Sequence, residues 1–321
     1  MKILNLIRYK NLIFIVLIQW LVFNSVITPI LAKYGMQPFL PQFCFWLITL
    51  ATVLIAAGGY VINDYFDLKI DRINRPEKVI IGEAISQKSA MSLYITLTSI
   101  GVLFGVIVSI LLKNSTLGFI FVITAGMLWF YSSTYKRQFL IGNLIVAFCS
   151  ALSLIVVLVA ESTLITARCG DLLYQISALV VQELYYWVCG FAFFAFVLTF
   201  TREIVKDLED IKGDREMECR TLPIVWGECK AKIVVTCLLV LTLVALLFVD
   251  INVTINLNLP NDRFTLSSFC RSGIIVLTTM MMFYLWYKKV ENRYKMVSLF
   301  IKIMMVVGVS YMLIFNYLMA K

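Results

Sequence analysis

Nine apolar windows, separated by short polar segments, dominate the hydrophobic pattern of this chain. A helix needs about 20 mostly apolar residues to cross the hydrocarbon core of a bilayer, and each window is close to that length. The windows cover residues 11–32, 42–62, 91–112, 116–133, 140–160, 184–201, 232–250, 271–287 and 297–319. We therefore predict an all-α polytopic membrane protein, a bundle of nine transmembrane helices that forms a single domain over residues 1–321.

The basic residues between these windows predict an orientation. With the N-terminus inside, the inner segments hold 21 of the 28 Lys and Arg residues, and segments 64–90 and 201–232 hold most of those. Positive residues accumulate on the cytoplasmic side of membrane proteins. We therefore expect an N-in, C-out protein of the plasma (inner) membrane, with these two segments facing the cytoplasm.

Composition agrees with a membrane protein and excludes several function classes. The chain is 61% hydrophobic and 15% charged, whereas about half apolar is typical of soluble domains. Its net charge of +9 fits the positive-inside pattern, so we expect no nucleic-acid partner. Histidine is absent, which excludes zinc or haem held by His and any Ser–His or Cys–His dyad. The eight cysteines contain no C-x-x-C pair and are expected to pack as small apolar residues.

Two groups of three aspartates share one spacing, and each follows an apolar window. The spacing i, i+3, i+7 places three side chains on one face of a helix, where like charges repel unless a cation neutralises them. The two groups are Asp64, Asp67 and Asp71, and Asp207, Asp210 and Asp214. We interpret them as two halves of one divalent-metal site on the cytoplasmic side.

The ligand chemistry of these groups favours a hard cation and a phosphorylated substrate. Oxygen ligands without His or Cys favour Mg²⁺, with Mn²⁺ as the alternative. Mg²⁺ is usually held by a few carboxylates together with water and substrate phosphates, so a diphosphate bridged by metal is expected. Phosphate groups would also need cationic side chains, and Arg72, Arg202 and Lys206 lie beside the acidic groups in the sequence. Arg8 and Lys136 lie at the predicted cytoplasmic ends of other helices, from which they could reach a shared cavity.

The two acidic stretches resemble the motifs of the UbiA superfamily of intramembrane prenyltransferases. Residues 63–71 match N-D-x-x-D-x-x-x-D completely, and residues 202–215 read R-E-x-x-K-D-x-x-D-x-x-G-D-R. The run R-T-L-P-I follows at residues 220–224. Smaller matches are Arg8 with Asn11, the segment 131–136, and Gly142 with Asn143. The resemblance covers the full length, and nine helices agree with an all-helical prenyltransferase domain.

The resemblance implies a role for each matching residue. It assigns metal contacts to Asn63, Asp67, Asp210 and Asp214. It assigns further catalytic roles, as ligands or as groups that orient the acceptor, to Asp64, Asp71 and Asp207. Binding of the prenyl diphosphate would fall to Arg8, Asn11, Arg72, Tyr131, Lys136, Arg202 and Lys206. The implied reaction is Mg²⁺-dependent transfer of a prenyl group, with release of diphosphate, to a membrane-associated acceptor.

The form of the second motif favours one class of prenyl acceptor over the others. It looks most like the branch similar to geranylgeranylglycerol-phosphate geranylgeranyltransferases, which make an ether lipid. Aromatic quinone precursors, such as 4-hydroxybenzoate or dihydroxynaphthoate, and haem- or chlorophyll-type acceptors are the alternatives within the superfamily. The expected partners are therefore a prenyl diphosphate, a lipid or aromatic acceptor and membrane lipids, with no obligate protein partner evident.

A divalent cation transporter is the alternative from another class, because intramembrane carboxylates often mark ion paths. Here the acidic groups lie at the predicted cytoplasmic ends of helices, and the nearby Arg and Lys residues would repel a transported cation. A CDP-alcohol phosphotransferase is disfavoured, because its D-G-x-x-A-R signature is absent and Tyr65 follows Asp64.

Overall fold

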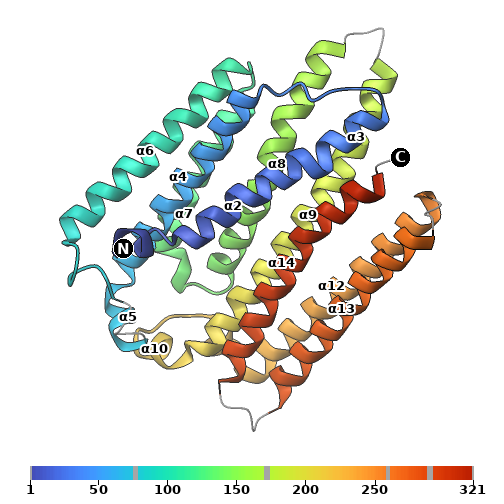
Figure 1. Cartoon of the computed structure of the whole chain (residues 1–321). Coiled ribbons are helices and arrows are strands. Elements are labelled where there is room, and N and C mark those ends of the chain that lie inside the picture. The colour runs from blue at the N-terminus through green and yellow to red at the C-terminus, as the bar shows by residue number, and fades with distance from the viewer. Residues whose placement is uncertain (1, 75–78, 170–173, 258–260, 288–291, 320–321) are drawn as a thin grey trace. The chain divides into compact units, whose positions relative to one another are not determined.

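A computed structural model describes residues 2–74, 79–169, 174–257, 261–287 and 292–319, which are almost entirely helical (Figure 1). The elements in chain order are α1 (Lys2–Leu6), α2 (Tyr9–Leu21), the π-helix η1 (Val22–Ile27), α3 (Thr28–Lys33), α4 (Gln42–Phe66), α5 (Leu68–Asn74), α6 (Gln87–Leu111), α7 (Ser115–Ser133), the 3₁₀-helix η3 (Tyr135–Arg137), α8 (Ile141–Cys169), α9 (Tyr174–Glu209), α10 (Ile211–Glu216), α11 (Leu222–Trp226), α12 (Glu228–Leu257), α13 (Asn261–Trp286) and α14 (Arg293–Met319). The predicted all-α class is confirmed.

Eight stretches of helix within the described ranges are long and apolar enough to cross a membrane. They correspond to the predicted windows other than residues 271–287. That window coincides with a shorter apolar helix, Ser272–Trp286. The protein is therefore an integral membrane protein, whereas the count of nine spans and the N-in orientation stay predictions.

The first span continues through a proline that would ordinarily interrupt a helix. Its middle turn is the π-helix η1, and Pro29 lies in the first turn of α3, where a missing backbone N–H costs least. The Thr28 hydroxyl donates to the Phe23 carbonyl at 2.9 Å, which satisfies one carbonyl in the widened turn. Residues 9–33 consequently form one span despite Pro29.

The chain divides into two compact units, Met1–Ala192 and Phe193–Lys321. In the first unit, α4 packs along α6 and α7, and α2 and α8 also contact α4 (Figure 1). The approach of α4 to α6 is close, because a Cβ on Gly58 would lie 2.3 Å from the Thr98 hydroxyl oxygen. Small residues at such contacts are typical of helix packing in membranes.

A buried polar side chain joins three helices of this unit. The Gln19 side chain, on α2, is fully buried and donates to the Thr52 hydroxyl at 3.1 Å and to the Ser153 carbonyl at 2.8 Å. These acceptors belong to α4 and α8 respectively. Interhelical hydrogen bonds of this kind hold spans together where lipid supplies no hydrophobic drive for association.

In the second unit, α12 packs against α11 and α13, and α13 packs against α14. One carboxylate links the first turns of α12 and α14. Glu228 accepts from Lys232, Arg293 and Tyr294 over 2.6–2.7 Å. Lys232 is buried, so this carboxylate neutralises a cation that would otherwise be costly.

Candidate active site

The first acidic motif lies where α4 ends and α5 begins. Asp67 sits between the two helices with φ −83° and ψ −2°, and its backbone N–H donates to the Asn63 carbonyl at 2.9 Å. The Asp71 N–H in turn donates to the Asp67 carbonyl at 2.8 Å. Asp64, Asp67 and Asp71 were predicted to share one face of a single helix, but the helix breaks at Asp67. This backbone conformation is found at the third residue of type I turns and at many active-site residues.

A cluster of three polar side chains, two of them buried, forms at this break. Asn63 and Asp67 are buried, and the Asn63 amide nitrogen donates to Asp67 Oδ2 at 2.8 Å. The Lys136 ammonium contacts the same Asp67 Oδ2 and lies 3.3 Å from Asn63 Oδ1. The two residues that the sequence assigned to metal therefore hold the ammonium of a residue that it assigned to diphosphate.

The position of Lys136 is set by a close backbone approach. Lys136 lies in η3, between α7 and α8. A Cβ on Gly142, at the start of α8, would lie 2.9 Å from both the Lys136 Cα and the Tyr135 carbonyl oxygen. Only glycine allows η3 to lie this close to α8 without displacement. Gly142 therefore has a positional role that its sequence match did not reveal.

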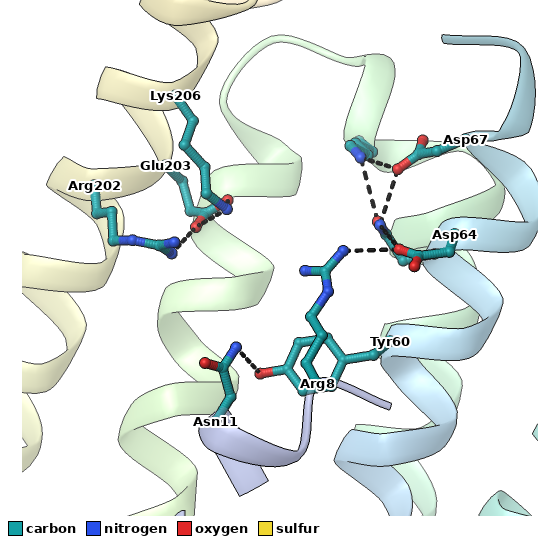
Figure 2. A network of polar contacts seen from close by, with 10 residues as sticks. Arg8, Asn11, Tyr60, Asp64, Asp67, Arg202, Glu203 and Lys206 are labelled. Atoms are coloured by element: carbon teal, nitrogen blue, oxygen red, sulfur yellow. Dashed lines mark hydrogen bonds and ion pairs between the residues drawn. The ribbon is translucent and has the colours of Figure 1, made fainter. Parts of the chain in front are cut away.

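Arg8 reaches the first motif from a break between α1 and α2. Its backbone is left-handed, with φ 53° and ψ 52°, which is uncommon for a residue other than glycine. Its guanidinium donates to Asp64 Oδ1 at 2.7 Å and lies over the Tyr60 ring, 4.9 Å from the centroid (Figure 2). Asn11 is exposed and donates to the Tyr60 hydroxyl at 3.3 Å.

The charges of this cluster shift one another's pKa values. Burial alone would lower the pKa values of Arg8 and Lys136, but Asp64 raises that of Arg8, Asp67 raises that of Lys136, and both end above their usual values. Tyr131 adds to both rises. Burial, aided by Asp67, raises the pKa of Asp71 to about 6, although Lys136 opposes the rise. Both cations therefore stay charged at neutral pH.

The position of Arg72 neither supports nor opposes its predicted role in binding the diphosphate. It lies in the last turn of α5 and is exposed. The predicted binding roles of Arg72, Asn11 and Tyr131 stay predictions, as do the roles predicted for all the other site residues. Tyr65 and Leu68, which belong to the segment of the first motif, pack against a cluster of buried apolar residues; its members are Leu6, Val61, Ile81 and Ala90.

The second acidic motif repeats the backbone arrangement of the first. Asp210 sits between α9 and α10 with φ −96° and ψ 9°, and its N–H donates to the Lys206 carbonyl at 2.9 Å. The Asp214 N–H donates to the Asp210 carbonyl at 3.1 Å. Asp207 and Asp210 are half-buried, and each makes interactions of its own.

The R-T-L-P-I run ties this motif to the next helix. Thr221, the residue before α11, is buried, and its hydroxyl donates to Asp214 Oδ2 at 3.4 Å. Pro223 follows in the first turn of α11, where it is compatible with a helix. The run therefore supplies a hydroxyl donor to the Asp214 carboxylate.

Glu203 belongs to the second motif, and its spacing alone predicted no role for it. It is buried in α9 and accepts from both predicted diphosphate ligands of this motif (Figure 2). The distances are 2.9 Å from Arg202 and 2.8 and 3.0 Å from Lys206. The R-E-x-x-K spacing could have revealed the pair, because residues three apart on a helix face each other. Glu203 therefore holds both cationic side chains through one carboxylate.

The donor set of each motif suits a hard cation. The first motif offers an amide oxygen and carboxylates, and the second offers carboxylates. Asn63 and Asp67 already direct oxygen atoms at one positive group. Within the described residues no three Asp, Glu, Cys or His side chains gather as a metal-ligand cluster.

The model of the UbiA prenyltransferase family matches residues 21–304 of this chain. Both acidic motifs, Lys136 and Gly142 lie within that range, whereas Arg8 and Asn11 precede it. A digeranylgeranylglyceryl phosphate synthase from Sulfurisphaera tokodaii is 35% identical over 198 residues. The match spans 62% of this chain and 63% of that relative, so the chain matches under two thirds of the relative's length.

Solved structures support the same fold. A structure reported for a digeranylgeranylglyceryl phosphate synthase in membranes is similar to 98% of this chain and 97% of its own, with a TM-score of 0.60 and 23% identity. A UbiA homologue from Archaeoglobus fulgidus, bound to DMAPP and Mg²⁺, is similar over 98% of this chain and 99% of its own, with a TM-score of 0.56 and 15% identity.

Proposed function

The chain belongs to the UbiA prenyltransferase family, and we propose that it transfers a geranylgeranyl group from its diphosphate to a geranylgeranylglycerol phosphate-type ether lipid precursor. The main support for this acceptor is the 35% identity to a relative named digeranylgeranylglyceryl phosphate synthase. The R-E-x-x-K-D-x-x-D-x-x-G-D-R run, which resembles the same branch, also supports it.

We propose that Mg²⁺ is the metal, with Mn²⁺ as a substitute. Asn63 and Asp67 would hold it through Oδ1 and Oδ2, the atoms that now face the Lys136 ammonium. Asp210 and Asp214 would serve as ligands in the second motif, as their spacing predicts. When bound, the metal would withdraw negative charge from the leaving diphosphate.

The side chains of each motif would do the remaining work of binding and orientation. Lys136 and Arg8 carry positive charge at neutral pH and would donate to diphosphate oxygens, which stabilises the charge that develops there as the allylic C–O bond breaks. Arg202 and Lys206, pre-oriented by Glu203, would do the same in the second motif. Asp64, Asp71 and Asp207 would orient the acceptor hydroxyl and the basic residues.

The membrane location of the site is also part of the proposal. We place the protein in the plasma membrane, with both acidic motifs on the cytoplasmic side, because the segments that carry them hold most of the inner Lys and Arg residues. A water-soluble prenyl diphosphate headgroup would then bind at the membrane surface while its apolar tail lies among the spans.

The test is a diphosphate-release assay on the full chain, purified in detergent, with geranylgeranyl diphosphate and Mg²⁺. Geranylgeranylglyceryl phosphate should be consumed, whereas 4-hydroxybenzoate and dihydroxynaphthoate should not, and EDTA should stop the reaction. Consumption of only an aromatic acceptor would replace the lipid by a quinone precursor. No release with any donor, together with Mn²⁺ uptake into vesicles that contain the protein, would favour the transporter instead.

A further inference from the structure

The Lys136 ammonium occupies the position that the first motif would offer to a metal ion. It lies against Asp67 Oδ2 and 3.3 Å from Asn63 Oδ1. These are the same two oxygen atoms that the proposed function assigns to Mg²⁺, so any role of this contact in metal binding rests on that proposed function. A second cation cannot join the ammonium there, because two positive charges a few ångströms apart in a buried site repel strongly.

The contact belongs to a well-defined site. The Asp67 side chain is 5% exposed, so its carboxylate needs a counter-charge in the metal-free protein. Gly142 brings the backbone of Lys136 to this position, and Asn63 completes the arrangement by donating to Asp67 at 2.8 Å. The side chain of Lys136 is 35% exposed, and its flexible four-carbon stem can move without displacing η3.

An anion offers the ammonium another partner. A diphosphate carries more negative charge than the Asn63–Asp67 pair and accepts charge-assisted hydrogen bonds from lysine. If Lys136 turns to the diphosphate, the two protein oxygens become available to the metal that accompanies it. Binding of the anion and binding of the metal are then linked, and by linkage each strengthens the other.

We propose that Lys136 is a cation placeholder. Its ammonium binds Asn63 and Asp67 in the metal-free protein, and metal replaces it there only when the ammonium moves to a bound diphosphate. Free metal therefore binds weakly, whereas metal together with diphosphate binds well. This arrangement prevents the site from filling with metal before the prenyl diphosphate arrives. Lys136 is in this sense a positioning residue for the metal, in addition to its proposed role at the diphosphate.

The test measures Mn²⁺ binding to the full chain in detergent by electron paramagnetic resonance of the free ion, with and without inorganic pyrophosphate. Lys136→Met removes the charge and keeps the length of the side chain. We expect it to bind Mn²⁺ in the absence of pyrophosphate about tenfold more tightly than the unmodified protein, and to gain less from added pyrophosphate. Lys136→Arg keeps the charge and should bind free Mn²⁺ as weakly as the unmodified protein.

Arg137→Met is the matched control, because Arg137 is the exposed basic neighbour of Lys136 in η3. It should leave Mn²⁺ binding unchanged under both conditions. When Asp67→Asn is combined with Lys136→Met, the increase in Mn²⁺ affinity that Lys136→Met causes should disappear. That result would assign the increase to the Asn63–Asp67 pair.

Three outcomes would overturn the placeholder. One is Lys136→Met protein that elutes and melts as the unmodified protein does but binds free Mn²⁺ no more tightly. Another is an equal increase in affinity for free Mn²⁺ in Lys136→Arg, which retains the positive charge. The third is an equal increase in Arg137→Met. Failure of the proposed function is distinguishable, because added pyrophosphate would then not strengthen Mn²⁺ binding to the unmodified protein.

Discussion

Asp67 and Asp210 hold the same local position in two separate helix breaks. Each lies between a long helix and a short one, with ψ near zero, and each donates its backbone N–H over 2.9 Å to the carbonyl four residues before it. In each case the aspartate four residues further on donates its N–H to the carbonyl of the break residue. The two motifs thus share backbone geometry as well as spacing.

This equivalence predicts that Asp67→Asn and Asp210→Asn have similar effects on catalysis. Each exchange keeps the shape of the side chain and removes the charge that a metal ligand needs, so prenyl transfer should fall by about a hundredfold or more. The measurement is the initial rate of diphosphate release at saturating Mg²⁺. Exposed Glu83→Gln and Glu216→Gln are the matched controls and should retain full activity. Near-normal turnover in either aspartate variant would remove that residue from the site.

Gly142→Ala should disturb the site through the backbone. The new Cβ would lie 2.9 Å from the Lys136 Cα, so η3 must shift, and overpacking of this kind costs about 1–3 kcal/mol of stability. We expect a lower melting temperature in detergent and weaker binding of the prenyl diphosphate. Gly126→Ala in α7 is the control, because a Cβ there meets nothing within 4 Å. Equal behaviour of the two alanine variants would contradict the close approach.

Glu203→Gln should weaken substrate binding more than chemistry. Loss of the carboxylate releases Arg202 and Lys206 from their shared acceptor, so both must be ordered when the diphosphate binds. We expect the KM for the prenyl diphosphate to rise about tenfold with kcat little changed. Glu203→Asp should recover part of the loss. A fall in kcat with an unchanged KM would show that Glu203 does not act by orienting these cations.

Glu161→Gln should destabilise the protein without altering the site. Glu161 is fully buried in α8 and accepts from the backbone N–H groups of Phe39 and Leu40 at 2.7 and 2.9 Å. Glutamine retains a single acceptor oxygen and leaves one of these donors unpaired, which costs about 1–3 kcal/mol. Thermal unfolding in detergent measures the loss. Lys33→Gln breaks a more exposed ion pair with Glu183 and should change stability by less than about 1 kcal/mol.

Asp71 should make the stability of the metal-free protein depend on pH. Its pKa of about 6 is above the usual value, so the folded protein favours the protonated acid more than the unfolded chain does. The resulting stabilisation is complete below the ordinary pKa near 4 and is lost as pH rises through about 6. In EDTA, the melting temperature of Asp71→Asn relative to the unmodified protein should therefore rise between pH 4 and pH 7. A constant difference across that range would argue against the raised pKa.

The sequence alone determined the class of the fold and the kind of chemistry. In lipid, the backbone N–H and C=O groups of a single apolar segment can pair with one another only in a helix. The helical spans therefore follow from local composition. The two N-D-x-x-D and D-x-x-D-x-x-G-D patterns likewise required only residue type and spacing. For these reasons residues 63–71 and 202–215 were identified as the motifs of a prenyltransferase family before any contact was known.

Tertiary structure decided which groups meet. The breaks at Asp67 and Asp210 could not be read from a spacing that also fits a continuous helix. The contact of Lys136 with Asp67 joins residues 69 positions apart, and that of Arg8 with Asp64 joins residues 56 apart. Such pairings depend on how helices pack, for example on the space that Gly142 leaves for η3. Local sequence sets the direction of a side chain on its helix, but only packing of the helices places a partner opposite it.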